Sequence, residues 1–151
     1  MHKRFSPTPR WIVLALVIGG LLAAGPALAG QRSIVGSWDV VAVDDATGEE
    51  ALALFTYNRG GTFDGTAPAG NISSAAGAWE RIGPRTFACT FLSYVYGPDG
   101  SIALRVENRH VAQVSSNGQH LTATFDVFVT LPDGTPVENQ TATGTGTRIR
   151  P

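Results

Sequence analysis

Between residues 35 and 149, β-branched and aromatic residues come in short runs that are separated by Gly, Pro, Asn and Asp. Almost no stretch shows the hydrophobic period of about 3.6 residues that marks an amphipathic helix, so the pattern predicts an all-β fold. Eight strands are expected, at residues 35–43, 50–57, 61–67, 74–82, 86–96, 101–114, 121–131 and 135–149. The connections between them are short, which favours a meander in which each strand pairs with the next.

Several connections carry turn sequences, such as Pro98-Asp99-Gly100, Asn117-Gly118 and Pro132-Asp133-Gly134. An open meander of this size would expose two long strand edges, and closure into a barrel removes them. The alternative is a two-sheet sandwich, whose Greek-key crossings need a long connection. We therefore expect a single eight-stranded antiparallel up-and-down β-barrel.

The turns also predict the register of the last four strands. A three-residue loop closed by Gly97 and Ser101 would set Ala88 opposite His110. A type I′ turn at Asn117-Gly118 would set His110 opposite Phe125, and the second Pro-Asp-Gly turn would set Phe125 opposite Thr141. Directly opposed residues share a face, so one face collects Ile102, Leu104, Val106, Leu121, Ala123, Phe125, Val127, Val129 and Val137. This apolar face should be the interior, while Arg109 and Asp126 should oppose each other outside.

Polar residues fall on the same inward face, chiefly Asn108 and His110. By the same parity, Thr90, Tyr94, Tyr96, Asn139, Thr141 and Thr143 accompany them. Buried polar groups need partners, so the interior is either a self-satisfied hydrogen-bond network or a cavity that takes a polar group from a ligand. The residues predicted to line such a ligand-binding lumen are Thr90, Tyr94, Asn108, His110, Phe125 and Thr141.

The strand at 86–96 is apolar on both faces. In the predicted register Phe87, Cys89, Phe91 and Val95 point outward, which suggests a covering segment or a homo-oligomer contact through Phe87, Phe91 and Val95. The alternative is a β-bulge that shifts the register by one residue and returns the Phe side chains to the core. Cys89 is the only cysteine, so no intramolecular disulfide can form, and it reads as a small core residue.

The first 29 residues have the order of a cleavable signal peptide. Basic residues precede an apolar run at 11–22, and small residues end in Ala27-Leu28-Ala29. A membrane anchor is the alternative, but the run is short and broken by glycines. We therefore expect cleavage near Ala29/Gly30, a mature domain at residues 30–151, and a secreted or periplasmic location.

The net charge of the mature chain and the absence of known site motifs exclude several classes of binding partner. Loss of three basic residues with the signal leaves eight of the 11, all Arg, against 12 acidic ones, so the mature net charge is about −4. Neither a nucleic acid nor an anionic membrane surface is an expected partner. No metal-binding, phosphate-binding or nucleophile motif is found, so neither a metal nor a cofactor is predicted.

Gly36-Ser37-Trp38 opens the first strand, and Arg148 lies near the end of the last. This resembles the lipocalin-like, or calycin, barrels, in which a Gly-x-Trp motif begins the first strand and a basic residue of the last strand packs across the indole. The resemblance implies that Trp38 and Arg148 meet as structural residues at one end of the barrel, where a guanidinium over an indole is stabilising.

Three functions follow, in order of preference. The first is an exported binding protein that holds a small, mostly apolar molecule in its lumen, as the fold and a mixed polar and aromatic interior favour. The second is a cyclase or isomerase that uses His110 or Tyr94 as acid or base, for which allene oxide cyclase-like barrels are an architectural precedent. The third is a structural or interaction protein with a filled barrel.

Overall fold

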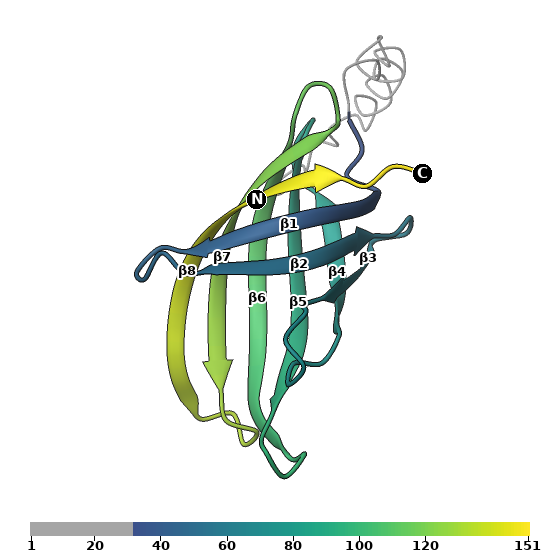
Figure 1. The fold of residues 1–151 in the computed structure, drawn as a ribbon. Helices are drawn as coiled ribbons and strands as arrows, with labels where there is room; N and C mark the ends of the chain where they lie inside the picture. Colours follow the sequence, from purple (N-terminus) through teal and green to yellow (C-terminus); the bar gives the residue numbers. More distant parts are fainter. Residues whose placement is uncertain (1–31) are drawn as a thin grey trace, which may run out of the picture.

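The computed structural model describes residues 32–151, which form one closed barrel of eight antiparallel strands in chain order (Figure 1). The predicted all-β, up-and-down architecture is confirmed. The strands are β1 (Gly36–Asp44), β2 (Glu50–Tyr57), β3 (Thr62–Thr66), β4 (Ala75–Arg81), β5 (Thr86–Tyr96), β6 (Ile102–Val114), β7 (His120–Thr130) and β8 (Pro136–Arg148). The predicted signal peptide at 1–29 lies outside the described residues. Within residues 32–151, no helix is long and apolar enough to cross a membrane.

The two halves of the chain contribute strands of different length. β1 to β4 contain 5 to 9 residues each, whereas β5 to β8 contain 11 to 13. β1 pairs with β8 only from Trp38–Arg148 to Asp44–Ala142, so the first part of β8 runs on beyond β1. Figure 1 shows β1 and β2 crossing in front of the upper parts of the long strands, which continue below them.

Both Pro-Asp-Gly turns close as predicted, but each is followed by a β-bulge. The amide of Gly97 donates to Ser101 O at 2.8 Å, and the pairing then jumps from Tyr96–Ile102 to Val95–Leu104, which leaves Ala103 as the extra residue. β8 repeats this arrangement with Val137 as the extra residue. A bulge increases the local twist, which helps long strands to coil into a barrel wall. In β8 the preceding Pro136 also lacks the N–H that a regular ladder needs.

These bulges make the predicted β5–β6 and β7–β8 registers wrong by one residue. His110 opposes Cys89 rather than Ala88, and Phe125 opposes Ala142 rather than Thr141. A shift of one residue exchanges the two faces of a strand. The predicted outward orientation of Phe87, Cys89, Phe91 and Val95 is therefore wrong, and the alternative with a bulge is correct. The predicted inward orientation is wrong for Thr90, Tyr94, Tyr96, Val137, Asn139, Thr141 and Thr143, which are all exposed.

The predicted β6–β7 register is confirmed, although its turn differs. His110 opposes Phe125, and Arg109 opposes Asp126. Asn117 does not have the positive φ that a type I′ turn requires. Instead the Ser115 amide donates to His120 O at 2.8 Å, so a longer loop closes the hairpin in the same register.

The core occupies the half of the barrel that all eight strands enclose. Its fully buried large side chains are Ile34, Trp38, Val40, Tyr57, Phe63, Phe87 and Val114. Glycines on β8 let the wall approach this core closely: a Cβ at Gly144 would lie 2.8 Å from the ring of Phe125. We call this half the closed half, and the part beyond β1 the open half.

Candidate functional site

Trp38 and Arg148, which are paired across β1 and β8, close the end of the barrel that lies away from the open half. The Arg148 guanidinium lies over the indole, with its Cζ 4.2 Å from the ring centroid. It donates hydrogen bonds to the backbone oxygens of Val35, Ser33 and Gly118 at 2.6 to 2.7 Å. The indole Nε1 donates to Ile34 O at 2.8 Å. The predicted meeting of Trp38 and Arg148 is confirmed, and their polar groups close this end with satisfied hydrogen bonds.

A hydrogen bond between Tyr57 and His110 lies at the centre of the closed half. The Tyr57 hydroxyl and His110 Nε2 are 2.7 Å apart, and both side chains are buried. Rings surround the imidazole: it stacks on Phe55 at 5.7 Å and lies 5.1 Å from Phe125 between centroids. His110 Nδ1 has no hydrogen-bond partner among residues 32–151.

Burial keeps both members of this pair neutral. It lowers the pKa of His110 to about 4 and raises the pKa of Tyr57 far above its usual value, with the nearby Cys89 adding to the latter shift. An acid or base works best with a pKa close to the operating pH. The geometry thus favours a structural role for this pair, in which Tyr57 satisfies one ring nitrogen inside an aromatic core.

Cys89 is inside the barrel next to this pair, directly opposite His110 on β5. The side chain is 4% exposed and its thiol is free. Burial raises the pKa of the thiol to about 12. A thiol that stays protonated is a poor nucleophile, so Cys89 contributes packing rather than reactivity.

The six predicted lumen residues divide into two sets. Asn108, His110 and Phe125 face inward, with His110 and Phe125 buried and Asn108 half-buried. Thr90, Tyr94 and Thr141 lie on the outer surface because of the two bulges. The structure therefore brings together only the inward residues that the β6–β7 register predicted.

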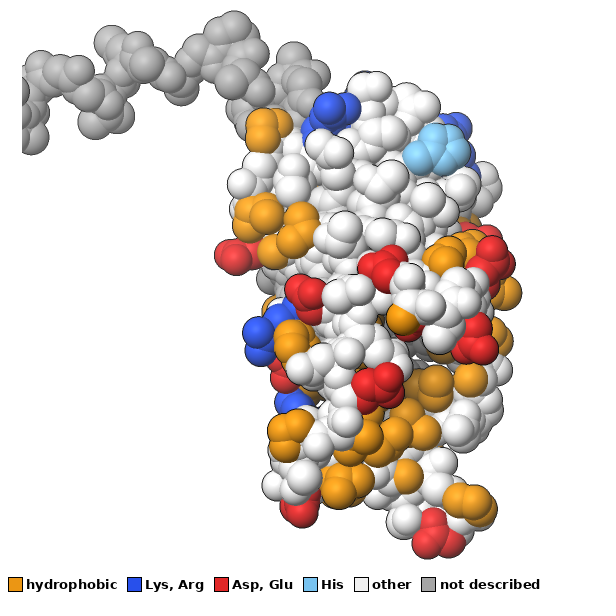
Figure 2. Space-filling model, turned by 90° about the vertical axis from the view of Figure 1, so that its left-hand side faces the viewer, with side chains coloured by type: hydrophobic (Ala, Val, Ile, Leu, Met, Phe, Trp, Pro, Cys, Tyr) orange, Lys and Arg blue, Asp and Glu red, His pale blue; other side chains and the backbone are white. Residues whose placement is uncertain are grey.

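The open half presents apolar side chains that nothing within residues 32–151 fully covers. Leu104 and Val106 on β6, and Val127 and Val129 on β7, face inward by the register of their strands and remain half-buried. Figure 2 shows apolar side chains gathered in a hollow in the lower half of the molecule. We call this surface, defined by these four residues, the trough.

Polar groups border the trough at its inner end and along β8. Asn108 is the next inward residue after Val106 and stands between the trough and the aromatic core. Its side chain makes no hydrogen bond to other residues of the described part of the chain. Gln140 and Glu138 oppose Val127 and Val129 from β8 and are exposed. Apolar walls with a few polar groups are the usual composition of a ligand site.

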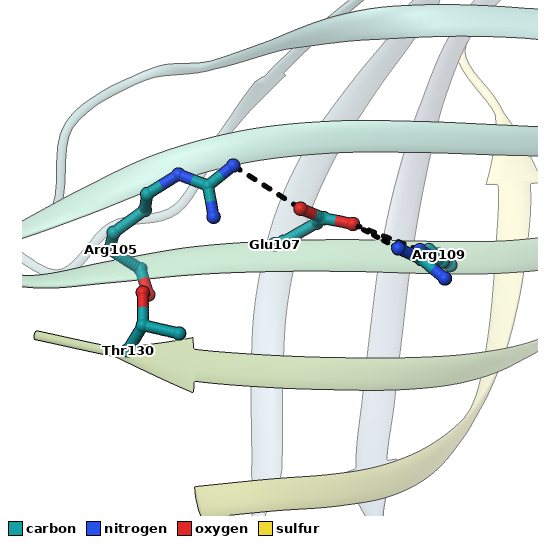
Figure 3. A network of polar contacts seen from close by, with 4 residues as sticks. All are labelled: Arg105, Glu107, Arg109 and Thr130. Atoms are coloured by element: carbon teal, nitrogen blue, oxygen red, sulfur yellow. Dashed lines mark hydrogen bonds and ion pairs between the residues drawn. The ribbon is translucent and has the colours of Figure 1, made fainter. Parts of the chain in front are cut away.

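The outer surface carries two other features. On the outer face of β6, Glu107 pairs with Arg105 at 3.2 Å and with Arg109 at 2.7 Å (Figure 3). The hydrogen bond from Arg109 is the main reason that the pKa of Glu107 is lowered. Arg109 is thus paired along its own strand rather than with Asp126.

A shallow groove of ≈ 850 Å³ also lies on the outer side of β1 and β6 to β8. Most of its lining side chains are Thr and Val, including Val41, Val43, Thr122, Thr124, Thr143 and Thr145. Five of the twelve lining residues are Thr, whose hydroxyl group leaves less apolar area than the Leu and Val side chains of the trough. Glu50 is the only ionisable group among the described lining residues. No three His, Cys, Asp or Glu residues within 32–151 are arranged to hold a metal ion.

The residues of the trough were predicted to face inward, but as part of the core rather than of a site. The signal that distinguishes them is the length of their strands. The last four predicted strands are longer than the first four, so part of their inner face has no counterpart across the barrel.

Comparison with known protein families finds no family that matches the chain. Comparison with curated proteins finds no matching sequence either.

Proposed function

We propose that this protein binds a small, mostly apolar molecule in the trough. The observation that carries this proposal is the set of inward aliphatic side chains, Leu104, Val106, Val127 and Val129, that lie beyond the reach of β1 and stay half-buried. Burying their remaining exposed area against a ligand would be favourable by about 25 cal/mol per Å². The side-chain amide of Asn108 would give the ligand one hydrogen-bonding group at the inner end.

The two other functions have less support. Tyr94, one predicted acid or base, lies on the outer surface, and His110, the other, is buried with a lowered pKa, so neither of the two groups predicted for acid–base catalysis is suited to it. A purely structural protein agrees with the filled closed half but gives no reason for the half-buried aliphatic wall of the trough.

We also propose that the barrel acts outside the cytoplasm and is a distant calycin-type protein. The signal-like order of residues 1–29 supports export, and the Trp38–Arg148 contact supports the family resemblance. A secreted or periplasmic binding protein would meet apolar molecules that have low solubility in water, for which a partly open apolar site is suitable.

Titration with Nile red, an uncharged apolar dye, tests the binding site. The protein of residues 30–151 should enhance and saturate the dye fluorescence, and Leu104→Ser should weaken binding about tenfold by removing apolar contact area. Leu54→Ser is the matched control, because Leu54 is 51% exposed on β2 and lines neither the trough nor the outer groove. Absence of saturable binding, or equal affinity of all three proteins, would overturn the proposal.

A further inference from the structure

Acidic side chains gather at the open end of the barrel. The connections there are β1–β2, β3–β4, β5–β6 and β7–β8, and none of them contains Lys or Arg. Arg105, which opposes Thr130 at the end of β7, lies on the outer face and is paired with Glu107. The acidic residues of this end are Asp44, Asp45, Glu49, Glu50, Asp99, Asp133 and Glu138. Figure 2 shows acidic side chains along the border of the hollow.

Arginines gather at the other end. Six of the eight in residues 32–151 lie in or beside the connections of the closed end: Arg32, Arg59, Arg81, Arg85, Arg148 and Arg150. The other two, Arg105 and Arg109, lie on the outer face of β6 and are both paired with Glu107. The described part of the chain therefore offers no free cation at the mouth of the trough.

Several of these carboxylates are held in the charged form. Turn hydrogen bonds from Thr47, Ser101 and Thr135 lower the pKa of Asp44, Asp99 and Asp133, respectively. The negative potential at the open end thus persists at neutral and mildly acidic pH. Such a potential raises the local concentration of cations and disfavours anions.

The trough is long enough for an extended alkyl chain. From Leu104 to Asn108 the wall follows a single strand, a length of about 13 Å, which is close to the extended length of an alkyl chain of about ten carbons. The wall at this level is aliphatic on both β6 and β7. The inner end of the trough meets the packed aromatic core and only the uncharged amide of Asn108, so a charged head group has to lie at the open end.

We propose that the occupant of the trough is a cationic amphiphile, with an alkyl chain against Leu104, Val106, Val127 and Val129 and an ammonium group among the carboxylates of the open end. This inference rests on the proposed function, because it assigns the ligand class of the same site. Glu138 lies directly beside the apolar wall, because it opposes Val129 in the pairing of β7 with β8 and so faces inward. A fatty acid would instead bring its carboxylate into an acidic mouth.

Displacement of Nile red by two ligands of equal chain length tests the charge preference. Decyltrimethylammonium and decanoate, both below their micelle concentrations, should differ in displacing concentration by about tenfold in favour of the cation at low salt, as expected for a few exposed charge contacts. Salt should reduce this ratio by screening. Equal displacement, or a preference for decanoate, would overturn the cationic assignment while bound Nile red still supports the trough.

A variant that removes one carboxylate tests whether the acidic residues of the open end cause the preference for the cation. Glu138→Gln should lower the preference for the cation about threefold, without changing Nile red affinity. Glu80→Gln is the control, because it removes the same charge from an exposed position on β4 near the closed end. An equal change in both variants would mean that net charge alone selects the ligand, which would overturn the role of the acidic mouth. Failure of the wild type to bind Nile red would instead refute the proposed function itself.

Discussion

The guanidinium of Arg148 lies 4.2 Å from the ring centroid of Trp38 and joins the last strand to the first. Its three hydrogen bonds to backbone oxygens also tie the segment before β1 and the β6–β7 loop to the same point. One side chain thus holds three parts of the chain that are distant in sequence. The joint adds to the ladder of seven residue pairs by which β1 and β8 close the barrel.

The contact predicts that Trp38 and Arg148 are energetically coupled. Trp38→Ala should destabilise the barrel by about 3–5 kcal/mol because it leaves a large buried cavity. Arg148→Ala should also destabilise, and the double variant should lose less than the sum, because each single variant already removes the shared contact. Urea unfolding of the four proteins measures this coupling, and strict additivity would contradict it.

Gly77 lies where β4 and β5 approach each other closely, so we expect stability to be sensitive to substitution at this position. A Cβ there would clash with the carbonyl oxygen of Thr90 and lie 2.6 Å from Phe91 Cβ. Gly77→Ala should therefore cost about 2 kcal/mol or more, because the backbone of β4 or β5 has to move. Thermal or urea unfolding measures the loss.

Gly70 provides the matched control for this substitution. It has no positive φ, and a Cβ at this position would meet nothing within 4 Å. Gly70→Ala should change stability by no more than about 0.5 kcal/mol. A similar loss in both variants would show that the close approach at Gly77 is not the cause.

Export predicts a defined N-terminus. When the full chain is expressed in a bacterium with an ordinary secretion pathway, the protein recovered from the periplasm or medium should begin at or near Gly30. Mass spectrometry or N-terminal sequencing measures this. Replacing Ala27 and Ala29 with Gln should leave the signal attached, since small residues are required at the cleavage site, and intact Met1 in the wild-type protein would contradict the prediction.

Local patterns were sufficient to predict the architecture of this barrel. Runs of β-branched residues between turn sequences predicted all eight strands, and short connections predicted their order. The joint of Trp38 and Arg148 was implied by the resemblance to calycin barrels, and it agrees with a closed meander, in which the first and last strands are neighbours. The β6–β7 register was correct even with a different turn, since both loops give the same pairing.

The bulges at Ala103 and Val137 were not predictable from turn chemistry. Each follows a Pro-Asp-Gly turn that closes as expected, so the local sequence is satisfied with or without the extra residue. The choice is made by packing, because only the shifted register buries Phe87 and Phe91. The candidate site depends on this choice, which removed Thr90, Tyr94 and Thr141 from the interior.

The burial of His110 predicts that the folded protein loses stability in acid at pH values well above the pKa of the carboxylates. Burial lowers its pKa from 6.5 to about 4 in the folded protein, so between these values the unfolded chain binds a proton that the folded protein does not. Stability therefore falls as the pH falls through this window and is unaffected above it. Lowering the pH from 7.5 to 5.0 should lower the free energy of unfolding by about 2 kcal/mol through His110 alone.

Urea unfolding at both pH values should show that His110→Gln loses this part of the pH dependence, whereas His120→Gln, a change at an exposed position, retains it. The same pH dependence in all three proteins would mean that His110 is protonated without cost, which contradicts its burial among Phe55, Phe125 and Tyr57.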